Sequence, residues 1–120
     1  MIQRLDEDEA AELLAKERAI LYKHSPTCWI SAMAQIAVQQ FAIEHPDTPV
    51  YEVDVLRNRP LSRTLAETLA VPHESPQVIV LRHGEPVWTA SHLDITTDEL
   101  AAVTRQLRRA ASEDAGDRAG

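Results

Sequence analysis

Apolar residues recur three or four positions apart in several segments of the chain, as they do along one face of a helix. Such segments are residues 6–18, 28–44 and 61–70, with a last one that begins at Thr96 or Thr97 and ends at about Arg109. Acidic residues early in the first and last segments, and arginines late in the last one, match the helix dipole. The pattern therefore predicts a helix in each segment.

Short apolar runs alternate with these segments and predict strands. They lie at residues 19–24, 50–55, 77–81 and 85–90. The run at 50–55 alternates apolar and polar positions with period two, and Pro26 follows the run at 19–24. Only a tight turn around Gly84 connects the last two runs, so we expect an antiparallel hairpin there.

The predicted elements follow the order α-β-α-β-α-β-β-α. A strand, a helix and a strand of this length form a right-handed parallel crossover, and the hairpin extends the same sheet with helices on both faces. We therefore expect an α/β protein with a thioredoxin-like fold, in which helices flank a four-stranded mixed sheet and an extra N-terminal helix precedes it. Residues 1–109 are expected to form this one domain. Residues 110–120 are small and polar without periodicity, which predicts a disordered tail.

Charge and hydropathy restrict the possible partners. The chain has 19 acidic and 12 basic residues, for a net charge of −7, whereas a general nucleic-acid binder needs a basic face. No apolar stretch approaches the length of a membrane span, and no basic segment followed by an apolar one begins the chain, so we expect neither membrane insertion nor export. The expected location is the cytoplasm, where a thiol stays reduced.

Cys28 is the only cysteine of the chain and stands where a predicted helix begins. Unpaired backbone N–H groups, here those of Ile30 and Ser31, and the positive end of the helix dipole stabilise a thiolate at such a place. Ser31 occupies the position where a dithiol enzyme has its second cysteine. Lys23 and His24, at the end of the preceding strand, would add positive potential unless they point to solvent. A lone cysteine needs a thiol from another molecule to complete a redox cycle.

Less specific interpretations apply to the same residues. A lone cysteine is commonly a small core residue, although Cys28 follows turn residues. Trp29 is either an exposed contact or a packing residue, and packing is expected for Trp88. Arg57, Arg59 and Arg63 either bind a carboxylate or solvate a loop. The histidines are scattered and have no second cysteine as a companion, so no metal site is expected.

The segment His73-Glu74-Ser75-Pro76 comes directly before the third predicted strand. In thioredoxin-like proteins a cis-proline at this point faces the active thiol, so the fold favours a cis Pro76, although most X-Pro bonds are trans. By the same logic, Ser75 would present its backbone to a bound peptide or thiol compound. The alternative for His73 and Glu74 is a solvated loop.

Several short segments, considered together, point to a family. They are Lys23-His24-Ser25, Thr27-Cys28, Ile30-Ser31, Arg59 with Ser62, His73-Glu74-Ser75-Pro76-Gln77, and Ala90-Ser91-His92 with Ile95-Thr96. From about Ala19 to Val103 the chain thus resembles the monothiol bacilliredoxins, small thioredoxin-like proteins of the bacillithiol system. One departure is Trp29, because the family usually has Pro directly after its cysteine. Trp29 restores a backbone N–H and adds a bulky ring beside the sulfur.

The resemblance implies a thiol-disulfide oxidoreductase that removes bacillithiol, a thiol built from glucosamine, malate and cysteine, from protein mixed disulfides. Cys28 would be the catalytic residue, no cofactor would be bound, and bacillithiol would be the co-substrate, with S-thiolated proteins as partners. The expected thiolate environment is Trp29, Ile30, Ser31, Lys23 and His24, and the expected substrate-binding residues are Thr27, Arg59, Ser75, Pro76, Ser91 and His92. Lys23, Arg59 and His24 are candidates for holding the malate carboxylates.

Two alternatives come from other functional classes. One is an iron–sulfur carrier like the monothiol glutaredoxins, in which a protein cysteine and a small thiol from each of two subunits hold a cluster. The chain has no glutaredoxin-type glycine motif after its cysteine. The other is a thioredoxin-like interaction module whose thiol is incidental, for which the pKa of Cys28 would lie near the value of a free thiol.

Overall fold

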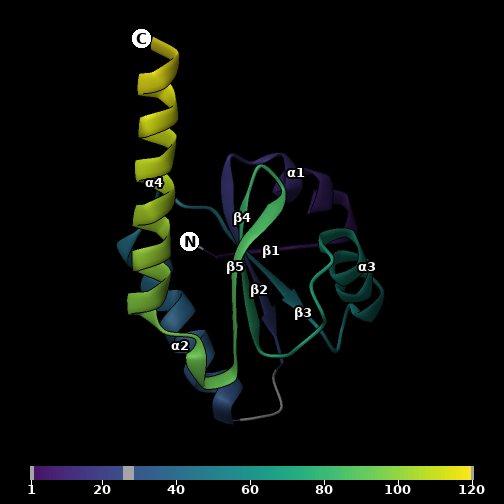
Figure 1. Cartoon of the computed structure of the whole chain (residues 1–120). Coiled ribbons are helices and arrows are strands. Elements are labelled where there is room, and N and C mark those ends of the chain that lie inside the picture. Colours follow the sequence, from purple (N-terminus) through teal and green to yellow (C-terminus); the bar gives the residue numbers. More distant parts are fainter. Residues whose placement is uncertain (1, 26–28, 120) are drawn as a thin grey trace.

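The computed structural model describes the backbone of residues 2–25 and 29–119 and the side chains of residues 2–25 and 29–109. A mixed sheet with the strand order β1-β3-β2-β4-β5 forms its centre (Figure 1). The strands are β1 (Ile2–Arg4), β2 (Arg18–His24), β3 (Val50–Asp54), β4 (Gln77–Arg82) and β5 (Glu85–Ser91). β1, β2 and β3 are parallel, whereas β4 and β5 run antiparallel to their neighbours.

Helices cover both faces of the sheet, as Figure 1 shows. They are α1 (Ala10–Ala15), α2 (Trp29–Glu44), α3 (Arg59–Leu69) and α4 (Thr97–Ala119), with short 3-10 helices at Glu7–Glu9 and His92–Asp94. Phe41 of α2 and Leu100 of α4 belong to the core on one face, and Leu13 of α1 and Leu65 of α3 to the core on the other. The predicted α/β class and thioredoxin-like layout are therefore confirmed.

The central strand β2 is covered on both faces of the sheet, which determines the face on which each of its side chains lies. Its residues Ile20 and Tyr22 enter the core under α2 and α4, while Leu21 enters the core under α1 and α3. Side chains alternate between the faces of a strand, and a strand covered on both faces is apolar throughout. The same alternation directs Lys23 toward the α3 face and His24 toward the α2 face.

The N-terminal part of the structure differs from the sequence prediction in one strand and one helix. β1 was not predicted, and it makes the sheet five-stranded by pairing with β3. Three residues are too few for a period to be recognised, and their pairing partner lies far along the chain. The first helix ends at Ala15 rather than Arg18, because Arg18 already pairs with Arg82 in the sheet.

The last helix continues to Ala119, whereas the prediction ended it at Arg109. The residues beyond 109 are rich in alanine and contain no proline, so a helical backbone is compatible with them even without apolar periodicity. In Figure 1 this end of α4 projects past the sheet. The domain boundary at residue 109 stays a prediction.

The turn between β4 and β5 depends on Gly84. Its φ is +78°, and a Cβ atom there would lie 2.6 Å from the backbone oxygen of Leu14. We expect Gly84→Ala to lower the free energy of unfolding by about 2 kcal/mol, because the side chain meets both a left-handed backbone and a fixed carbonyl. Urea unfolding would measure this change.

Glu85→Ala is the matched control, since Glu85 is exposed in the next position. It should change the free energy of unfolding by less than about 0.5 kcal/mol. Equal midpoints for the two variants would contradict the described turn.

Candidate functional site

Polar residues meet at one edge of the sheet, where β2, β3 and β5 end and β4 begins. Lys23 of β2 pairs with Val53 of β3 on one side and with Gln77 of β4 on the other, and Gln77 pairs with Ser91 of β5. These four residues form one row across the sheet. α2 begins next to this row, at the residue that follows Cys28 in the sequence. Cys28 and Thr27 themselves lie outside the described residues.

On the α3 face, the buried residues Lys23 and Ser62 form a polar cluster with the exposed His73. The Lys23 side chain is fully buried, and its Nζ lies 3.1 Å from Nδ1 of His73. The Oγ of Ser62 lies 3.3 Å from the same Nδ1. The alternative in which Lys23 points to solvent is therefore wrong. His73 lies in an exposed loop, as the solvated-loop interpretation has it, but its ring contacts Lys23 and Ser62.

The chemistry of these groups determines the tautomer of His73. An ammonium group has donors only, so Nδ1 of His73 is the acceptor from Lys23, and the proton of the neutral ring is on Nε2. Burial lowers the pKa of Lys23. Burial, with the charges of Lys23 and Arg63, also lowers the pKa of His73, whereas Glu74 raises it. The neutral ring thus keeps one N–H donor available.

The loop that holds His73 is fixed by Gln77. Its side-chain amide donates to the carbonyl of Pro72 over 3.1 Å and accepts from the backbone N–H of Glu74 over 3.3 Å. The Ser75–Pro76 peptide bond in this loop is cis, the isomer that the sequence led us to expect. The backbone N–H of His92 donates to the carbonyl of Pro76 over 3.1 Å. The structure thus brings Ser91 and His92 beside Ser75 and Pro76.

On the α2 face, Tyr22 connects the end of β2 to the start of α2. Its hydroxyl lies 3.1 Å from Nδ1 of His24 and donates to the carbonyl of Ser31 over 3.4 Å. Burial, assisted by the charge of Glu52, raises the pKa of Tyr22 well above its usual value, so the phenol stays protonated. The Ser31 side chain is 1% exposed, and its Oγ has no hydrogen-bond partner within the described ranges.

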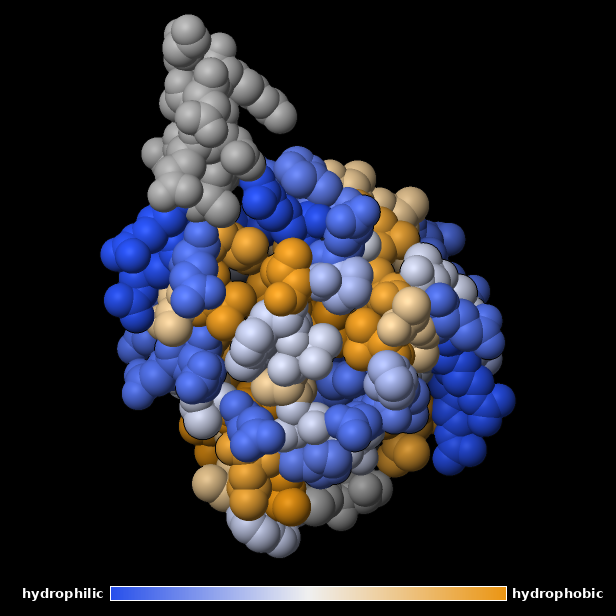
Figure 2. Space-filling model, in the orientation of Figure 1, coloured by the Kyte–Doolittle hydropathy of each residue, from blue (hydrophilic) through white to orange (hydrophobic). Residues whose placement is uncertain are grey.

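The outer surface of α2 is apolar where the helix begins. Trp29 is 65% exposed, Met33 53% and Leu93, from the neighbouring 3-10 helix, 57%. Figure 2 shows hydrophobic side chains at the bottom of the view, where α2 begins in Figure 1. The packing interpretation of Trp29 is therefore wrong, while Ile30 beside it is partly buried.

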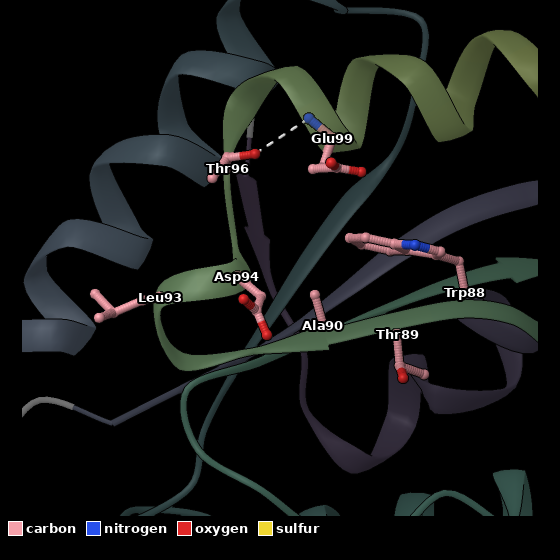
Figure 3. Close-up of a pocket in the computed structure, with 7 residues that line it drawn as sticks. All are labelled: Trp88, Thr89, Ala90, Leu93, Asp94, Thr96 and Glu99. Atoms are coloured by element: carbon pink, nitrogen blue, oxygen red, sulfur yellow. Dashed lines mark hydrogen bonds between the residues drawn. The ribbon is translucent and has the colours of Figure 1, made fainter.

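Two hollows of opposite character flank the site. Arg59, a predicted carboxylate ligand whose side chain is exposed, lines a hollow of about 250 Å³ together with Ser62, Arg63 and His73. The other hollow, of about 430 Å³, is shown in Figure 3. It lies between β5 and α4, and it is lined by Trp88, Thr89, Ala90, Leu93, Asp94, Thr96 and Glu99.

The hollow in Figure 3 is acidic. The backbone N–H of Glu99 donates to Oγ1 of Thr96 over 3.2 Å, and the hollow contains the carboxylates of Asp94, beside Ala90, and of Glu99, on the Trp88 side (Figure 3). Trp88 is partly buried and packs against the core under α2 and α4, in agreement with its expected packing role.

Within the described residues, no group of three or more metal-ligating side chains could hold an ion, and no helix is long and apolar enough to cross a membrane.

Sequence reasoning missed the polar partners on the α3 face. Ser62 appeared only as part of a matching segment, His73 as part of such a segment or of a solvated loop, and Arg63 only as one of several loop arginines. Lys23 and His73 are 50 residues apart in the chain, so no local pattern could pair them. The one available signal was a lysine near the end of an apolar strand, where a buried polar side chain must find a partner.

Comparisons with known proteins agree with this arrangement. The family model described as "Monothiol bacilliredoxin BrxC" matches residues 3–100. A solved structure described as a candidate oxidoreductase with a thioredoxin fold is 34% identical, with a TM-score of 0.78, and the match covers 84% of this chain and 91% of that one.

Two thioredoxins, described as thioredoxin f2 and thioredoxin f, share the fold at low identity. Thioredoxin f2 of Chlamydomonas reinhardtii is 17% identical, with a TM-score of 0.69 and coverage of 88% of this chain and 95% of that one. The short form of spinach chloroplast thioredoxin f is 14% identical, with a TM-score of 0.70 and coverage of 89% and 93%.

The contact between Lys23 and His73 predicts a measurable pKa change. Since the Lys23 charge lowers the pKa of His73, Lys23→Met should raise that pKa. The change would be measured by following the imidazole C–H resonances of His73 by NMR as a function of pH.

Lys16→Met provides the control, because Lys16 is a partly exposed lysine that pairs with Glu12 over 3.7 Å. It removes the same formal charge and should leave the pKa of His73 unchanged. A pKa of His73 that stays constant or falls in Lys23→Met would show that the two side chains do not interact as described.

Proposed function

Because the chain belongs to the monothiol bacilliredoxin family, we propose that it removes bacillithiol from mixed disulfides of client proteins, with Cys28 as the nucleophile. The observation that carries this proposal is the family match over residues 3–100, which includes the single cysteine of the chain. The solved structure that is described as an oxidoreductase with a thioredoxin fold, and is 34% identical to this chain, supports thiol redox chemistry in general. The proposed setting is the cytoplasm, where small thiols are kept reduced.

The proposed reaction consists of two thiol-disulfide exchanges. In the first, the Cys28 thiolate attacks the bacillithiol sulfur of the modified protein. A disulfide forms between Cys28 and bacillithiol, the original mixed disulfide breaks, and the client leaves as a thiolate. In the second, a bacillithiol thiolate attacks the bacillithiol sulfur on Cys28. Oxidised bacillithiol leaves and Cys28 is again a thiolate, so a second bacillithiol supplies the electrons. Another redoxin is the alternative reductant.

The start of α2 supports the activation of the thiol. α2 begins at Trp29 and has no acidic residue in its first turn, so its positive end is not neutralised by its own side chains. The first N–H groups of a helix have no partner within the helix and can donate to a thiolate. Ser31 is buried and bears a hydroxyl, which cannot form a disulfide. The adduct must therefore be resolved by another molecule.

The neighbouring segments supply a surface for the client. Ser75, Pro76, Ser91 and His92 lie together through the hydrogen bond between His92 and Pro76. We propose that their backbone groups, with Thr27, align the client segment, and that the exposed Trp29 contacts it. Lys23 is too deeply buried to touch a carboxylate in solution, so its proposed role is to position His73.

Intact mass spectrometry of the reduced protein tests the reaction. After incubation with a bacillithiol-modified client, Cys28 should gain the mass of one bacillithiol while the client loses it. Oxidised glutathione, supplied separately, tests whether another small thiol can replace bacillithiol. Ser31→Ala should still form the adduct at a changed rate, because its hydroxyl is not a leaving or attacking group.

Cys28→Ser is the matched control, since it removes the sulfur and keeps a small polar side chain. It should form no adduct and leave the client modified. Client release without any adduct on Cys28, or equal release by Cys28→Ser, would refute the mechanism.

A further inference from the structure

The hollow on the α3 face has an unusual combination of side chains. It has a volume of about 250 Å³ and is lined by Val55, Leu56, Arg59, Ser62, Arg63 and His73. Its apolar wall comes from the connection between β3 and α3, and its polar wall from the first turns of α3 and from the loop before β4. We call it the arginine pocket.

The polar lining of the arginine pocket consists of hydrogen-bond donors. Arg59 and Arg63 are four residues apart in α3, so their side chains lie on the same side of the helix, and both are exposed. Neither makes an ion pair in the part of the chain that the structure describes. His73 adds a ring whose Nδ1 already accepts from Lys23, which leaves Nε2–H as a donor. No acidic residue lines the pocket.

A buried charge lies behind this lining. Lys23 is fully buried, and among the described residues its ammonium contacts a neutral imidazole rather than a carboxylate. A buried cation without a counter-ion is costly, and an anion in front of it would offset part of that cost. The cationic character of the pocket is local, because the chain as a whole has a net charge of −7 and the hollow in Figure 3 is lined by Asp94 and Glu99.

We infer that the arginine pocket binds the dicarboxylate arm of the small thiol co-substrate, with Arg59 and Arg63 as its ion-pair partners and His73 as a further donor. Guanidinium groups bind carboxylates through paired hydrogen bonds, and two of them match the two carboxylates of a malate group. His73 precedes Ser75 by two residues, so the pocket lies beside the proposed thiol-exchange surface. The inference that this anion is part of the co-substrate rests on the proposed function.

Free malate tests the pocket independently of the redox chemistry. Titration of the full chain with malate should shift the NMR resonances of the His73 ring in a saturable way. Arg63→Ala should weaken this binding about fivefold, the effect of losing roughly 1 kcal/mol from an exposed ion pair. Inorganic phosphate is titrated in parallel, and tighter binding of phosphate than of malate would overturn the assignment to a dicarboxylate.

Arg57→Ala is the charge-matched control. Arg57 lies two residues before Arg59, is exposed, pairs with Asp54 over 3.9 Å, and does not line the pocket. It should bind malate as the unmodified chain does. Equal weakening by Arg57→Ala and Arg63→Ala would mean that malate senses only the net charge, and the pocket would be rejected.

Reaction rates connect the pocket to the co-substrate. The rate constant of Cys28 with oxidised bacillithiol is divided by that with the neutral bis(2-hydroxyethyl) disulfide, so that changes in thiol reactivity cancel. Arg63→Ala should lower this ratio about fivefold, by the same reasoning as for malate, whereas Arg57→Ala should preserve it.

The outcomes separate this inference from the proposed function. If Cys28 forms the bacillithiol adduct but Arg63→Ala changes neither the ratio nor malate binding, the pocket inference fails and the function stands. If malate binds through Arg63 but Cys28 forms no bacillithiol adduct, the carboxylate site stands, while its co-substrate role and the proposed function both fail.

Discussion

The burial of β2 on both faces of the sheet constrains the whole site. β3 and β4 pair with it on either side, so its successive side chains must enter opposite cores. Tyr22 and His24 therefore lie under α2, and Lys23 lies under α3. Because of this alternation, the polar side chains of Tyr22 and His24 lie on one face of the sheet and that of Lys23 lies on the other. The Tyr22 phenol contacts His24 and the carbonyl of Ser31 in the first turn of α2. On the other face, the Lys23 ammonium contacts the imidazole of His73 beside α3.

The burial that β2 imposes on Lys23 places a positive charge behind the arginine pocket, where it favours the binding of an anion. A fully buried ammonium loses its hydration, and its contact with His73 recovers only part of that loss. A hydrophobic residue would satisfy the same core at lower cost. The ammonium instead determines the tautomer of His73 and adds a positive charge behind Arg59 and Arg63. The cluster thus links the interior of the sheet to an open hollow at its edge.

The parts of the fold that could be predicted are those with a repeated local pattern. α2, with its unbroken apolar stripe, and β3, with its period of two, lie close to their predicted bounds. β1 is too short to show a period, and only its pairing with β3 identifies it. The end of α4 was misplaced for the opposite reason, since its last residues form a helix without an apolar stripe. Local propensity there was underestimated relative to periodicity.

The sequence by itself determined the class of fold, the position of a single cysteine directly before a long helix, and the family resemblance. These are properties of neighbouring residues, and they depend on backbone periodicity and helix polarity. Only the tertiary structure decided that Lys23 is buried, that His73 is its partner, and that Arg59 and Arg63 line one hollow with Ser62. Contacts across 50 residues arise from strand order and side-chain alternation, and no local pattern in the chain records them.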